Sequence, residues 1–117
     1  MFKQSNYNQM FRYFRELAKT KKRKLDNNTY LVVRDDGGFG IRLHETEVVI
    51  HYSDKIVLNS GGHKTVTTKD RMNRYTPFNI YQKNHKWFLE ASSTFDFKDN
   101  MEIRYNPYCI YYPAWQN

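Results

Sequence analysis

The sequence predicts an α+β fold: an antiparallel β-sheet with an N-terminal basic amphipathic helix and one short helix. Apolar residues follow a helical period near the N-terminus and a period of two from Thr29 onward, which is typical of strands with one buried face. Aromatic residues make up 17% of the chain and suit a pleated surface. We therefore expect one domain of 117 residues with more strand than helix.

The first predicted element is a helix over about residues 6–20. Its apolar face consists of Tyr7, Met10, Phe11, Phe14, Leu17 and Ala18. The basic run 21–24 continues its last turn, where positive charge suits the helix dipole, and Asp26-Asn27-Asn28 breaks the pattern. Residues 1–26 are thus expected to form a basic helical arm on or beside a β-rich body, residues 27–117.

Strand patterns and turn signals alternate through that body. The expected strands cover residues 29–34, 39–43, 46–52, 56–58, 78–82, 87–90, 94–97 and 101–105. A short helix capped by Thr67 or Thr68 ends before Pro77, with Met72 and Tyr75 facing the body. Its cations are expected to face outward: Lys69, Arg71 and Arg74.

The net charge of +7 is concentrated in the first 24 residues, which hold eight Lys or Arg and one acidic residue, Glu16. A phosphate backbone binds such a cluster by releasing counterions, while a membrane surface or an acidic protein also attracts it, and a solvated helix end needs no partner. We favour nucleic acid, RNA or DNA, or a complex that contains it. The expected contact residues are Arg12, Arg15, Lys19, Lys21, Lys22, Arg23 and Lys24.

Two further groups of residues are candidates for binding. Four cations lie near the start of the short helix, where free N–H groups beside Gly61-Gly62 suit an anion, although exposed residues on a capped helix are the simpler interpretation. They are Lys64, Lys69, Arg71 and Arg74. In the aromatic tail, Tyr111 and Trp115 would cover the core, form a protein interface or stack on unpaired bases. Pro107 and Pro113 exclude a central strand there.

Signals for catalysis, metals and membranes are weak. The single cysteine, Cys109, allows no intrachain disulfide or thiolate zinc cluster and favours a reducing compartment. The four histidines lack metal-ligand spacing, although a hairpin could bring His44 and His51 together. The N-terminus is polar, and no apolar run reaches the roughly 18 residues of a membrane span. We expect a cytoplasmic protein without metal, cofactor or membrane contact.

One stretch carries a family resemblance. Residues 41–49 read IRLHETEVV, and residues 60–73 read SGGHKTVTTKDRMN. This pattern resembles small bacteriophage and prophage proteins over about residues 29–90. The resemblance implies a phage origin and brings no assigned activity. His63 stands where that family tends to carry an aromatic residue, so the resemblance implies no catalytic role for it.

Three functions follow as hypotheses. The first is a non-catalytic phage accessory protein that binds nucleic acid, or a host complex containing it, in the host cytoplasm through the basic helix. The second is a protein-binding inhibitor of a host antiviral defence system, of the anti-CRISPR kind. The third is a small metal-independent ribonuclease, in which His63, Lys64, Arg71 and Tyr75 supply acid, base and charge.

Overall fold

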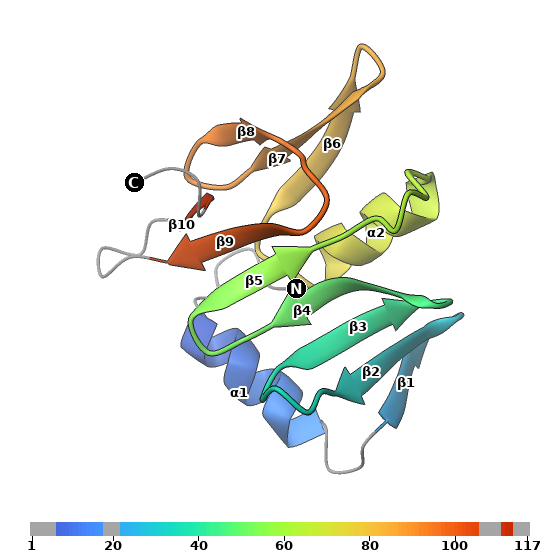
Figure 1. Ribbon diagram of the computed structural model, residues 1–117, viewed down its shortest axis with the longest axis vertical. Helices are drawn as coiled ribbons and strands as arrows, with labels where there is room; N and C mark the ends of the chain where they lie inside the picture. The colour runs from blue at the N-terminus through green and yellow to red at the C-terminus, as the bar shows by residue number, and fades with distance from the viewer. Residues whose placement is uncertain (1–6, 18–21, 106–110, 114–117) are drawn as a thin grey trace.

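Strand pairing organises the protein around a large antiparallel sheet. The computed structural model describes residues 7–17, 22–105 and 111–113. Within them, seven strands form a sheet of order β1-β2-β3-β4-β5-β9-β10 (Figure 1). Its strands are β1 (Lys22–Asp26), β2 (Thr29–Val33), β3 (Phe39–Leu43), β4 (Thr46–His51), β5 (Lys55–Leu58), β9 (Met101–Tyr105) and β10 (Tyr111–Pro113). Pro113 ends an edge strand, which agrees with the exclusion of a central one.

The remaining described elements are two helices and a smaller sheet. α1 (Tyr7–Leu17) precedes β1, and α2 (Val66–Arg74) follows β5. β6 (Asn79–Lys83), β7 (Lys86–Glu90) and β8 (Thr94–Asp96) form the second, three-stranded antiparallel sheet, which Figure 1 shows beyond β9 and far from β1. The predicted α+β fold class is therefore confirmed.

Polar residues close three of the hairpins in tight turns. Asn28 between β1 and β2 has a φ of 53°, and His44 between β3 and β4 has a φ of 55°. Asn84 and His85, between β6 and β7, have φ values of 52° and 63°. Asn tolerates this left-handed region better than most residues, which explains its place in two of these turns.

The large sheet has one buried face, here called the inner face. Strand alternation places Leu31, Ile41 and Ile103 on it, and all three are buried. α1 packs here, because the ring centroids of Phe11 and Phe39 lie 5.1 Å apart. α2 adds the buried Met72 to the same core. The opposite side is the outer face, where side chains such as Tyr30 and Val32 are only half-buried.

The basic run after the first helix was placed wrongly. Among the described residues, helix α1 covers Tyr7–Leu17, and Lys22, Arg23 and Lys24 belong to strand β1 instead of a last helical turn. The backbone of this segment pairs with β2, and Asp26 faces Thr29 across the hairpin. The polar residues after it form a hairpin turn and do not mark the end of a helix. Residues 18–21 lie outside the described part of the chain.

The N-cap of helix α2 lies two or three residues earlier than predicted. Thr65, in an extended conformation, is its N-cap, and its Oγ1 accepts a hydrogen bond from the Thr68 N–H at 3.2 Å. Neither Thr67 nor Thr68 is the cap. Met72 and Tyr75 are buried as predicted.

Asn73 connects α2 to the open edge of the small sheet. Its Nδ2 donates to the Ile80 carbonyl at 2.9 Å, and its Oδ1 accepts from the Ile80 N–H at 2.6 Å. The amide therefore satisfies the backbone of an edge strand as a neighbouring strand would.

An Asn73→Ala variant should lose about 2 kcal/mol of unfolding free energy, because two partly buried backbone groups lose their partners. Urea unfolding measures the loss. The control is Asn79→Ala, which removes an exposed amide from β6, the strand that contains Ile80. It should change stability by less than about 0.5 kcal/mol. Equal stability of the two variants would contradict this role for Asn73.

Candidate nucleic-acid interface

The outer face of the large sheet gathers cations at its β1 end. Lys24 lies directly opposite Tyr30, and Tyr30 directly opposite Arg42, so the three side chains form a row across β1, β2 and β3. Lys22, two residues before Lys24, shares this face. We call Lys22, Lys24, Tyr30 and Arg42 the basic face. Arg23 points the other way and is exposed at the sheet edge.

Tyr30 is the centre of this cluster. The Lys22 Nζ lies 4.4 Å from the centroid of the Tyr30 ring, and the Arg42 guanidinium carbon lies 5.7 Å from it. Both distances fall within the range of cation–π attraction. The Nε of Arg42 is buried and has no hydrogen-bond partner among the described residues. The basic face thus holds two cations against one aromatic ring.

The carboxylates on the rest of the outer face are engaged by other cations. Glu47, directly opposite Arg42 on β4, accepts from Arg34 at 2.5 Å. Its carboxylate lies over Gly40, where an added Cβ would clash with Oε1. Glu102 forms ion pairs with Lys55 at 3.1 Å and with Arg104 at 3.4 Å. Among the described residues, Lys24 and Arg42 are thus the cations of this face that form no ion pair.

Arg34 also binds Asp36, in the turn after β2. Hydrogen bonds from Arg34 and from the Tyr52 hydroxyl lower the pKa of Asp36 to about 2. Asp36 and Glu47 in turn raise the pKa of Arg34, with Asp36 contributing most. This network fixes the β2–β3 turn and keeps Asp36 ionised and occupied at neutral pH.

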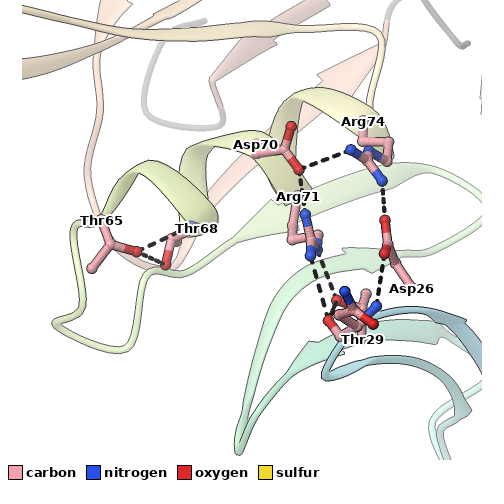
Figure 2. Close-up of polar contacts among 8 residues, drawn as sticks. Asp26, Thr29, Thr65, Thr68, Asp70, Arg71 and Arg74 are labelled. Carbon is pink, nitrogen blue, oxygen red and sulfur yellow. Dashed lines mark hydrogen bonds and ion pairs between the residues drawn. The ribbon is translucent and has the colours of Figure 1, made fainter.

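The four cations predicted to lie together near the start of α2 have two different environments. Arg71 points inward, contrary to prediction, and its Nε donates to the buried Thr29 Oγ1 at 2.8 Å (Figure 2). It also donates to Asp70. Arg74 bridges Asp70 and Asp26 (Figure 2). These two arginines attach α2 to the β1–β2 hairpin and are already paired.

Lys64 precedes the N-cap of α2, and Lys69 lies in the first half of the helix. Their Nζ atoms are 6.0 Å and 5.6 Å from the ring of Trp87, which is buried. The four cations predicted to grip one anion therefore do not gather at one point. The four residues suggested for a ribonuclease site are also separated, because Arg71 and Tyr75 are buried while His63 and Lys64 are exposed.

The other predicted binding residues are distributed as follows. Arg12 and Arg15 are exposed on α1, which packs on the inner face and so lies on the other side of the sheet from the basic face. Tyr111 is the first residue of edge strand β10. Lys19, Lys21 and Trp115 lie outside the described residues, as does Cys109.

The histidines occupy different environments. His44 lies in the β3–β4 turn and His51 at the far end of β4, so the hairpin does not bring them together as suggested. His51 is buried, with Nε2 2.8 Å from the Tyr75 carbonyl oxygen and its ring 4.4 Å from that of Phe14. Burial lowers the pKa of His51 to about 4, although the hydrogen bond to Tyr75 opposes this.

A surface cavity of about 800 Å³ lies between the β3–β4 turn and the start of α2. His44, Glu45 and His63 line it together with several hydroxyl side chains. Across the described residues, no group of three or more His, Cys, Asp or Glu side chains is arranged to hold a metal ion. The described helices also include none that is long and apolar enough to cross a membrane.

Two residues of the basic face were missed by the sequence prediction, Tyr30 and Arg42. The alternation in residues 29–34 and 39–43 already places each on the face opposite Leu31 and Ile41. The sequence does not reveal the cross-strand register that sets them beside Lys24.

Comparison with known proteins identifies the family. No curated protein and no solved structure matches the chain. One protein family, described as Kyanoviridae Gp96 protein, matches residues 5–104. This range includes both described helices, the basic face and the stretch that resembles phage proteins. The chain therefore belongs to the Kyanoviridae Gp96 family of bacteriophage proteins.

Proposed function

We propose that this phage protein is a non-catalytic accessory factor that binds nucleic acid through the basic face, in the cytoplasm of the host cell. The observation that carries the proposal is the gathering of Lys22, Lys24 and Arg42 around Tyr30 on the outer face. The phosphate backbone of a nucleic acid is complementary in charge to such a surface, and each phosphate that the cations neutralise releases condensed counterions.

The placement of the charges favours nucleic-acid binding over a basic surface that contacts only solvent. Lys24 and Arg42 form no ion pair within the described residues, while Glu47 and Glu102 on the same face are bound by other cations. The three cations come from β1 and β3, whose backbones are fixed by pairing with β2. Their positions on one face are therefore set before a phosphate backbone binds, which reduces the cost of ordering them.

Replacing Lys22 and Lys24 by Gln should weaken binding to a labelled oligonucleotide by roughly tenfold or more at low salt. The dependence of log K on log salt should become shallower by about 0.7 to 0.9 for each phosphate that the variant no longer neutralises. Titrations by fluorescence anisotropy over a range of salt concentrations measure both effects. The fold should persist, because both side chains are exposed.

The matched control is Arg12→Gln with Arg15→Gln, which removes the same charge from exposed positions of α1. This variant should bind nearly as the wild type does. Equal weakening of both variants would indicate attraction by net charge alone, and weakening of the α1 variant alone would assign binding to the helix. Either result contradicts the basic face as the binding surface.

An acidic host protein is the alternative partner, as an inhibitor of host defence would require. Salt would then act mainly on the association rate, and oligonucleotides would not bind. That outcome would reject nucleic acid as the ligand.

A further inference from the structure

We propose that the ligand of the basic face is single-stranded nucleic acid, with an unpaired base stacking at Tyr30 and Arg42 donating hydrogen bonds to the strand. This inference rests on the proposed function and narrows it to one class of nucleic acid. Three features of the basic face support it: the position of Tyr30, the unused donor of Arg42 and the open surface of the sheet.

Tyr30 lies where an unpaired base can stack on its ring. It is half-buried in the middle of the row formed with Lys24 and Arg42, so its ring is held between neighbours while part of it remains accessible. Lys22 lies over the ring, with its Nζ 4.4 Å from the centroid. A lysine side chain is long and flexible, so it can move from the ring to a phosphate when a base takes its place. Base–aromatic stacking is tolerant of sequence, because every base has a π-face.

Arg42 has a donor without an acceptor. Its Nε is buried and unpartnered among the described residues, a state that costs free energy in a folded protein. Glu47, directly opposite, is bound by Arg34 and does not supply the acceptor. A planar guanidinium suits two acceptor oxygens at once, as a phosphate or a base edge presents them. Because Nε is buried in the unbound protein, the Arg42 side chain must shift toward a bound strand before Nε can donate to it, and this shift would satisfy a group that the protein alone leaves unsatisfied.

The shape of the surface favours a single strand over a duplex. The contacts of α1 and α2 with the large sheet fall on inner-face residues such as Phe39, Thr29 and His51. The basic face is therefore the surface of a sheet, without a described helix to enter a groove. Duplex bases are read by elements inserted into a groove, whereas unpaired bases can splay onto an exposed aromatic ring.

The experiment compares three probes of about 12 nucleotides with the full chain: single-stranded DNA, single-stranded RNA and duplex DNA. At matched salt, one or both single strands should bind at least about tenfold more tightly than the duplex. Tyr30→Leu should lose about tenfold in affinity for the single strand, with the salt dependence unchanged, because stacking releases no counterions. Tyr30→Phe keeps the ring and should bind as the wild type does.

Two variants complete the test. Arg42→Lys keeps the charge, removes Nε and should weaken single-strand binding several-fold. Tyr13→Leu removes an exposed tyrosine from α1 and should leave binding unchanged, while thermal unfolding checks that every variant folds. Equal or tighter binding of the duplex, or wild-type affinity in both Tyr30→Leu and Arg42→Lys, would overturn this inference and leave the proposed function standing. Absence of binding to all three probes would instead reject the proposed function itself.

Discussion

An Arg71→Ala variant should lose about 3 kcal/mol of unfolding free energy, because a buried and fully engaged cation is removed. The guanidinium donates from Nε to Thr29, from Nη1 to Asp70 and from Nη2 to the Asn27 carbonyl at 3.4 Å. Together with Arg74, which binds Asp26, it links α2 to the β1–β2 hairpin. Chemical denaturation of the purified variant measures the loss.

The matched control for Arg71 is Arg74→Ala, on the same helix. Arg74 binds Asp70 and Asp26, but its side chain is 45% exposed, and exposed ion pairs contribute less than about 1 kcal/mol. The comparison separates burial from charge, because both substitutions remove one arginine bound to Asp70. A loss no larger in Arg71→Ala than in Arg74→Ala would show that Arg71 does not hold the hairpin in place.

Acid should destabilise the protein through His51. Burial lowers its pKa from the ordinary 6.5 to about 4, so the unfolded chain takes up a proton that the folded protein excludes. Stability from this group is complete above about pH 6.5 and decreases as the pH falls toward 4, by roughly 3 kcal/mol in total. Urea unfolding at about pH 7 and about pH 4.5 should reveal most of this decrease. Asp36, with a pKa of about 2, contributes mainly at lower pH.

A His51→Gln variant cannot take up this proton, so its stability should change much less between the two pH values, even though the variant is less stable overall. His85→Gln, which replaces an exposed histidine in the β6–β7 turn, should keep the acid sensitivity of the wild type. Identical pH dependence in wild type and His51→Gln would assign the acid sensitivity to other groups.

Most strands could be predicted because burial of one face imposes a period of two on the sequence. Residues 39–43 illustrate this, since Phe39, Ile41 and Leu43 are buried as their alternation indicates. Strand β1 was missed for the opposite reason. Four of its five residues, Lys22, Arg23, Lys24 and Asp26, are charged, and an edge strand needs backbone pairing more than buried side chains. Its cations also follow directly on a basic helical pattern.

The candidate site was predictable only in part. Charge alone marked Lys22 and Lys24, because the excess of cations near the N-terminus is visible in the sequence. The same criterion placed Arg71 on the surface, although Thr29 and Asn27 provide partners for it in the interior. Those partners lie more than 40 positions away in the chain, and only the packing of α2 on the hairpin brings them together.

The pairing of β5 with β9 has a consequence for how the chain folds. Leu58 pairs with Met101, and the whole of α2 and the small sheet lies between them in the sequence. Hairpins such as β2–β3 and β6–β7 close short loops, whereas β5–β9 closes a long one and carries a larger entropic cost. We expect the hairpins to form early and β9 to join β5 late. During synthesis, β5 then keeps one unpaired edge until the ribosome has released β9, so this strand is a point at which the nascent chain is exposed to association with other chains.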